Sequence, residues 1–133
     1  MPAITSRFIE RDTVQRLQHS PVALAAATYA YNAIPNEVRV DAVAAFVGMH
    51  RASFSRFFAR RVGITFVQFL QALRIERAVV ELERHDCPVS ALADAAGYGR
   101  VSSFCRTFKA VTGTTPSDYR RRRLLNLGSG PPY

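Results

Sequence analysis

The sequence is poor in cysteine and in long apolar runs, and each shortage excludes a class of protein. Two cysteines, Cys87 and Cys105, in 133 residues are too few for the disulfide framework of a small secreted domain. No apolar run approaches the ~18 residues that a membrane span needs, and the first residues lack the apolar core of a signal peptide. A composition that is 48% hydrophobic and 21% charged excludes a disordered or low-complexity chain. We therefore expect a cytoplasmic protein with one globular domain, or two very small domains that share a core.

Acidic residues are also scarce, and basic residues outnumber them by 18 to 10. The formal net charge is +8 and the sequence pI is near 10.5, so the chain attracts polyanions wherever its positive charges cluster. They do cluster, because the acid-free stretch 51–61 holds four arginines and residues 120–123 are an unbroken arginine run. Nucleic acid is therefore the first partner to consider, and an anionic membrane surface is the second.

Apolar residues recur at three- and four-residue spacing along the whole chain, which predicts an all-α fold. Ser20 and Pro21 are typical of a helix start. Further helices are expected over 41–47, 51–62, 65–84, 90–96 and 101–112, and a last one is expected from Pro116 into the arginine run.

Two stretches of the chain repeat each other. At an offset of 49, Ala44 and Gly48 correspond to Ala93 and Gly97. After a one-residue insertion, Ser53, Phe54, Arg56, Phe58, Gly63 and Thr65 correspond to Ser103, Phe104, Arg106, Phe108, Gly113 and Thr115. Each copy is a short helix, a turn that contains glycine and a second helix. This is the helix-turn-helix plan, in which the second helix enters the DNA major groove.

The second helix of each copy has two different faces. We assign the phenylalanines to packing, since Phe54 and Phe58 are one turn apart, as are Phe104 and Phe108. On another stripe, small side chains surround one arginine, which lets the helix approach base edges closely and lets the arginine bind guanine O6 and N7. These residues are Ala52, Ser55, Arg56 and Ala59 in the first copy and Ser102, Cys105, Arg106 and Lys109 in the second.

The segment 92–122 resembles the signature of the AraC/XylS family of bacterial transcription regulators. The matching residues are Leu92, Ala93, Gly97, Tyr98, Phe104, Arg106, Phe108, Lys109, Gly113, Thr115, Pro116, Tyr119 and Arg120. The upstream half is similar as well, at Ala44, Gly48, Phe54, Arg56, Phe58 and the run LRIERA at 73–78. The resemblance covers about 100 residues, from near Pro21 to Arg123.

The resemblance implies two helix-turn-helix subdomains, homeodomain-like three-helical units joined by a long linker helix. They are expected to bind adjacent major-groove segments of double-stranded promoter DNA and to activate transcription through RNA polymerase. The implied base-facing residues are Ala52, Ser55, Arg56, Val101, Ser102, Cys105 and Arg106. For contacts with the DNA phosphates we expect Arg51, Arg60, Arg61, Arg100, Lys109, Arg120 and Arg121.

The chain departs from the family pattern at the starts of both recognition helices. His50 and Gly99 stand where many relatives have serine, so weaker helix caps are expected. Arg100 and Val101 replace residues that are commonly acidic or small and commonly polar, which leaves the base preference of the second site open. Glu81 falls where the linker helix usually has leucine, so one turn of it should be more exposed.

The predicted organisation has five segments, and the chain is expected to be monomeric. These segments are an N-terminal arm or short helix (1–20), a first subdomain (21–64), a linker helix (65–85), a second subdomain (86–124) and a flexible tail (125–133). Residues 1–20 are too few for the effector-binding domain of longer relatives, so the chain is either a stand-alone regulator or a fragment of a larger one. The competing function is an interaction module that binds RNA polymerase or a partner regulator, with only weak DNA contacts.

Other chemistry finds little support in the sequence. His85, Asp86, Cys87 and the distant Cys105 lack the paired ligand spacing of a zinc site. Gly97-Tyr98-Gly99 lacks the third glycine and the preceding strand of a dinucleotide-binding loop, and no nucleophile elbow is present. Neither an enzyme nor a metal or organic cofactor is expected.

Overall fold

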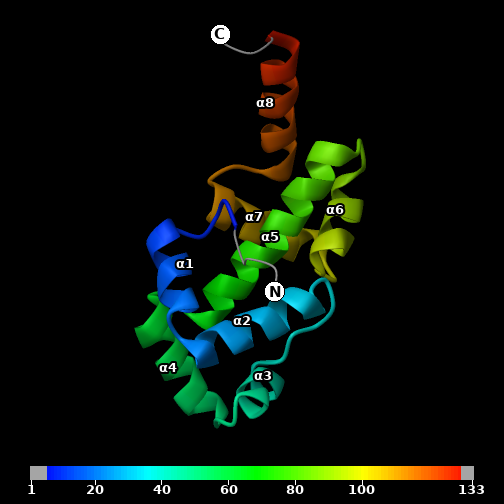
Figure 1. Cartoon of the computed structure of the whole chain (residues 1–133). Helices are drawn as coiled ribbons and strands as arrows, with labels where there is room; N and C mark the ends of the chain where they lie inside the picture. The colour runs from blue at the N-terminus through cyan, green and yellow to red at the C-terminus, as the bar shows by residue number, and fades with distance from the viewer. Residues whose placement is uncertain (1–5, 130–133) are drawn as a thin grey trace.

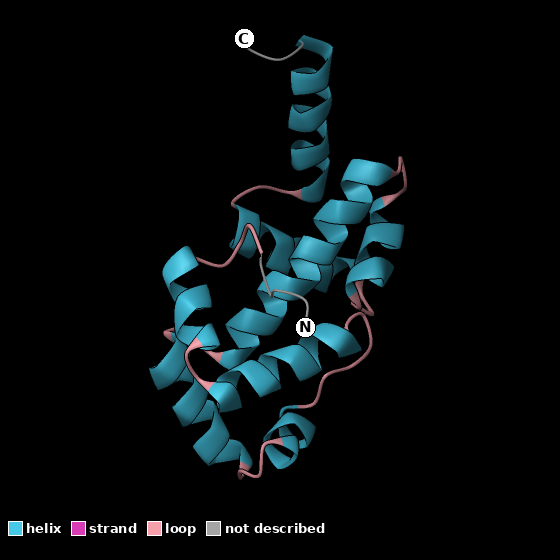
Figure 2. Ribbon diagram, in the orientation of Figure 1, coloured by secondary structure: helices cyan, strands magenta, loops and turns pink. Residues whose placement is uncertain are grey.

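A computed structural model describes residues 6–129, and in that range it has eight helices and no strand (Figures 1 and 2). The helices are α1 (Arg11–Gln18), α2 (Pro21–Ala33), α3 (Val40–Phe46), α4 (Arg51–Val62), α5 (Phe66–Arg84), α6 (Val89–Ala96), α7 (Val101–Thr112) and α8 (Pro116–Ser129). The all-α prediction is confirmed. Within the same range no helix is both long and apolar enough to cross a bilayer.

Local hydrogen bonds explain where α2 and α5 begin. Ser20 Oγ accepts a hydrogen bond from the Ala23 amide at 3.2 Å and Pro21 occupies the first turn of α2, as the sequence predicts. Helix α5 begins with a reciprocal pair, because Gln68 N–H donates to Thr65 Oγ1 and Thr65 N–H donates to Gln68 Oε1. Such a capping box satisfies two amides that the helix itself leaves unpaired.

The first helix-turn-helix unit packs α2, α3 and α4 around a cluster of phenylalanines. Phe54 and Phe58 of α4 are fully buried, and each meets the Phe66 ring edge-on with ring centroids 5.1 Å apart. In the second unit, α6 and α7 pack against α5 around Phe104 and Phe108. There the Phe108 ring lies edge-on to Tyr119 with centroids 5.6 Å apart. The assignment of these phenylalanines to packing is therefore confirmed.

Helix α5 belongs to the cores of both units. Its buried residues up to Leu73 join the first core, and those from Ile75 onward join the second. The boundary falls at Arg74, in the middle of a continuous helix. The first half of α5 is therefore part of the first core and the second half is part of the second core. Both halves of the helix pack within a unit, so α5 is not an unpacked linker.

Arg74 ties the two units together where the cores meet. Its Nη1 donates hydrogen bonds to the Pro35 carbonyl oxygen before α3 and to the Ala96 carbonyl oxygen at the end of α6, both at 3.1 Å. Its Nη2 donates to the Asn36 carbonyl oxygen at 3.0 Å. Burial lowers the pKa of this guanidinium. The turn at Gly97 lies so close to the Pro35 carbonyl that a β-carbon there would overlap it.

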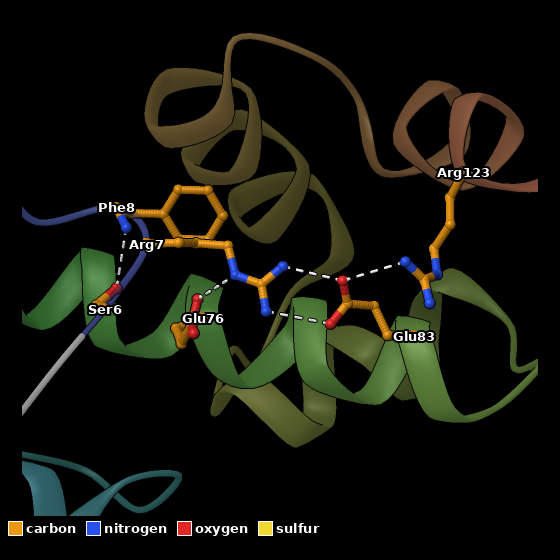
Figure 3. A network of polar contacts seen from close by, with 6 residues as sticks. All are labelled: Ser6, Arg7, Phe8, Glu76, Glu83 and Arg123. Carbon is orange, nitrogen blue, oxygen red and sulfur yellow. Dashed lines mark hydrogen bonds and ion pairs between the residues drawn. The ribbon is translucent and has the colours of Figure 1, made fainter. Parts of the chain in front are cut away.

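The segment before α1 also spans both units. Phe8 packs against both hydrophobic cores. Arg7 forms ion pairs with Glu76 (Nε–Oε2, 3.1 Å) and Glu83 (Nη1–Oε2, 2.9 Å) on α5, and Arg123 of α8 approaches the same Glu83 oxygen at 3.4 Å (Figure 3). The hydrogen bond between Arg7 and Glu83 raises the pKa of the guanidinium and lowers that of the carboxyl.

The structure corrects two sequence predictions. The flexible tail expected from residue 125 is helical at its start, because α8 continues to Ser129 and projects from the body (Figure 1). Its run of arginine and leucine favours a helix, and Gly128 does not end it. The remaining residues of that tail, 130–133, lie outside the described range. In addition, the N-cap of α7 is Arg100 rather than Gly99.

Candidate nucleic-acid interface

Helix α4 presents a small-residue face to the surface. Ala52, Ser55 and Arg56 are all exposed, whereas Phe54 and Phe58 on the opposite face have no exposed surface. The residues predicted to read bases in the first unit therefore lie together on one accessible stripe. A helix with this profile can approach a groove floor closely and still offer one guanidinium to a base edge.

Helix α7 repeats this arrangement with one difference. Val101, Ser102 and Arg106 are exposed, and Val101 offers an apolar surface of the kind that contacts a thymine methyl group. Cys105 is only half-exposed, because it packs against the second core. Three of the four residues predicted to read bases in this unit are thus exposed, and Cys105 is partly covered by the second core.

Both recognition helices begin without a side-chain cap. Neither His50 before α4 nor Arg100 before α7 accepts a hydrogen bond from the first turn with its side chain. Weak caps were expected from the sequence, although at Gly99 rather than Arg100 for α7. The first amides of each helix are thus left to water or to another acceptor, and the positive end of the helix dipole favours an anion there.

The residues expected to contact phosphates divide into two groups. Arg60, Arg61, Arg100 and Lys109 are exposed, and among the residues that the structure describes none of them is in an ion pair. Arg60 and Arg61 also line a surface hollow with Ser53, Arg56 and Phe57 of the same helix. The four free cations are the stronger candidates for phosphate contacts.

The second group of arginines has protein partners. Arg51 Nη1 lies 3.0 Å from Asp41 Oδ1, and Arg121 pairs with Asp118. Arg120 is half-buried and its Nη2 donates to the Cys87 carbonyl oxygen, which attaches α8 to the loop between α5 and α6. Arg120 thus has a structural contact that counts against its assignment to phosphate. A sequence run of arginines does not reveal which members turn inward.

A basic cluster that involves α1 was not predicted from the sequence. Arg16 and His19 of the N-terminal segment line a hollow with Arg60 and Arg61 at the end of α4. The mixed apolar spacing of residues 1–19 gave no signal for it. Both cysteines are free and half-buried, and in the described range no three His, Cys, Asp or Glu side chains gather as metal ligands would.

Sequence comparisons match most of the chain to helix-turn-helix proteins. A family described as "Helix-turn-helix domain" matches residues 43–122. An uncharacterized HTH-type transcriptional regulator of Staphylococcus aureus is 33% identical over 87 residues, which are 65% of this chain and 12% of that protein. A similar regulator of Haemophilus influenzae is 31% identical over 86 residues, or 65% of this chain and 29% of the relative. The chain therefore spans less than a third of either relative.

Solved structures of the same fold include a DNA complex. The C-terminal domain of AraT, a response regulator from Geobacillus stearothermophilus, superposes with a TM-score of 0.72 and 28% identity over 77% of this chain and 86% of that domain. The DNA-binding domain of AdpA, a global transcriptional factor solved with a target DNA, gives a TM-score of 0.69 and 26% identity over 77% of this chain and 92% of that one. An AraC-type regulator from Chromobacterium violaceum shares the fold with a TM-score of 0.71 at 23% identity.

Proposed function

This chain belongs to the AraC-type helix-turn-helix family, and from that membership we propose that it regulates transcription by sequence-specific binding to promoter DNA. Helices α4 and α7 read two adjacent major-groove segments. The observation that carries this proposal is a feature that the two helices share. Each buries two phenylalanines and exposes an arginine, Arg56 or Arg106, beside small side chains. The similar domain of AdpA was solved on its target DNA, which supports DNA as the ligand.

Base readers and phosphate contacts should respond differently to substitution. We expect Arg56→Ala and Arg106→Ala each to cost about 1–3 kcal/mol of binding free energy on the cognate site, because each removes a base contact in its own half-site. Arg60→Gln should weaken binding to every sequence alike and make the slope of log K against log salt less steep by about 0.9, because a phosphate carries no base identity.

Promoter fragments selected from genomic DNA, followed by fluorescence anisotropy on a cognate and an unrelated duplex, test both expectations. Equal losses on the two duplexes for Arg56→Ala and Arg106→Ala would make these arginines phosphate contacts. Failure of the chain to prefer any sequence at physiological salt would favour the alternative function, an interaction module with weak DNA contacts.

We propose further that the chain binds DNA as a monomer and activates transcription through RNA polymerase. An apolar hollow between α2 and α3 supports a protein contact in the first unit. Phe46 is 61% exposed there, and the centroids of the Phe46 and Tyr29 rings are 5.0 Å apart. Exposed apolar surface of this kind is typical of protein interaction sites.

Phe46→Ser is therefore expected to leave the Kd for cognate DNA unchanged and to lower promoter-dependent transcript yield at least severalfold with purified polymerase. Val22→Ser, which changes another exposed apolar residue of the same unit outside that hollow, is the control. An unchanged transcript yield in the Phe46 variant would remove this surface from activation.

A further inference from the structure

Helix α1 brings two basic side chains to the end of the first recognition helix. Arg16 and His19 line one surface hollow with Arg60 and Arg61. Figure 1 shows α1 beside α4, and the two helices are in contact. Helix α1 precedes the matched residues 43–122, so the family match assigns it no role.

The Arg16 side chain lies over the turn that follows α4. A β-carbon on Gly63 would come within 2.9 Å of Arg16 Nη1, so the guanidinium lies directly over this turn. The one acid paired with it in the described chain is Asp12, one turn earlier on α1, with 3.3 Å between Nη2 and Oδ2. Three arginines and a histidine thus line the hollow, and the carboxylate that pairs with one of them, Asp12, is exposed and does not line it. The charge of the hollow is unbalanced, which favours an anion from outside the protein.

The hollow is continuous with the DNA-facing surface of α4. Arg60 and Arg61 line this hollow and also the neighbouring one that contains Arg56. Arg56 and Arg60 are one helical turn apart, so they share a face of α4. A DNA strand whose bases meet Arg56 therefore continues past Arg60 toward α1.

We infer that Arg16 and His19, together with Arg60 and Arg61, bind a backbone phosphate of the DNA just outside the bases that α4 reads. The inference rests on the proposed function and adds α1 to the DNA-binding surface. Asp12 orients Arg16 in the free protein, and the phosphate replaces this carboxylate as its partner in the complex.

Three variants of α1 test the site by fluorescence anisotropy on a cognate and an unrelated duplex between 0.1 and 1 M salt. Arg16→Gln removes one cation, so the slope of log K against log salt should become less steep by about 0.9. Relative to the unmodified chain, the variant should then lose about eightfold more affinity at 0.1 M salt than at 1 M salt. The loss should be equal for both duplexes. Arg16→Lys keeps the charge and should keep the slope. Arg11→Gln removes an exposed charge of the same helix that does not line the hollow, and it should leave the slope unchanged.

Asp12→Asn should raise DNA affinity where Arg16→Gln lowers it. This variant therefore tests the site even if Arg16→Gln lowers the stability of the fold. Loss of the competing carboxylate should raise affinity for both duplexes by about 1.4- to 5-fold, the range of an exposed charge pair. Unchanged slopes for Arg16→Gln and unchanged affinity for Asp12→Asn would overturn the α1 site while sequence preference through Arg56 remained. If the unmodified chain bound the cognate and the unrelated duplex equally well, that result would instead contradict the proposed function itself.

Discussion

Replacement of Gly97 by alanine is expected to cost about 2–5 kcal/mol of unfolding free energy and to separate the two helix-turn-helix units. Two effects add together. Gly97 has φ +87°, and a left-handed conformation costs an alanine about 1–2 kcal/mol. The new β-carbon would also overlap the Pro35 carbonyl oxygen and Arg74 Nη1, and overpacking of a rigid contact adds about 1–3 kcal/mol. Relief requires the α6–α7 turn to move away from the first unit.

The internal repeat supplies a matched control for this substitution. Gly48 is the counterpart of Gly97 in the first unit and has φ +75°, but a β-carbon there would meet nothing within 4 Å. Gly48→Ala should therefore cost only the backbone strain of about 1–2 kcal/mol. Urea unfolding of both variants measures the difference. Equal costs at the two positions would mean that the contact between the units does not hold Gly97 in solution.

Separation of the units should also be visible on DNA. Gly97→Ala is expected to protect one half-site in footprinting at protein concentrations where the unmodified chain protects both, because the second recognition helix loses its fixed position. Gly48→Ala should retain the two-site footprint when enough folded protein is present.

The sequence predicts those parts of the molecule that depend on local pattern. The bounds of α4 and α7, the buried faces of their phenylalanines and the exposure of Arg56 and Arg106 all follow from helical periodicity and from the repeat. Helix bounds and buried faces depend on residues within one or two helical turns, so the spacing of apolar and polar residues is enough to predict them.

Contacts between distant segments could not be predicted in the same way. Arg74 bonds to carbonyl groups 22, 38 and 39 residues away, and Arg7 reaches Glu83 across 76 residues. Carbonyl acceptors exist at every residue, so no residue type marks the ones that Arg74 selects. The cluster of Arg16, His19, Arg60 and Arg61 was missed for the same reason, because its members come from distant parts of the sequence and form no motif.

Insertion of one alanine after Arg74 is expected to abolish recognition of one half-site. Helix α5 has 19 residues and forms a rod of about 28 Å, close to the ~34 Å between successive major-groove segments on one side of the duplex. One extra residue rotates everything beyond it by about 100° and shifts it by ~1.5 Å. Because the second core is built on the distal half of α5, the second unit should turn with the helix as a body.

The position of the insertion decides which contacts survive. Arg74 remains in the proximal half, so its hydrogen bonds to Pro35 and Asn36 can persist, while the bond to Ala96 is lost. Arg7 can no longer reach Glu76 and Glu83 in the same register. Each core keeps its own residues on its own side of the insertion. The variant should therefore remain helical and lose mainly the fixed angle between the recognition helices.

Specific binding should then fall by about half of its free energy, roughly 2–5 kcal/mol, because a duplex would have to bend for both helices to enter their grooves. Circular dichroism confirms that the variant is folded, and footprinting on the cognate promoter counts the protected half-sites. An alanine inserted after Leu125, in the projecting part of α8, is the control and should leave the footprint intact. A folded variant that still protected both half-sites with unchanged affinity would show that the units adjust independently, since a shared rigid helix cannot absorb a rotation of about 100°.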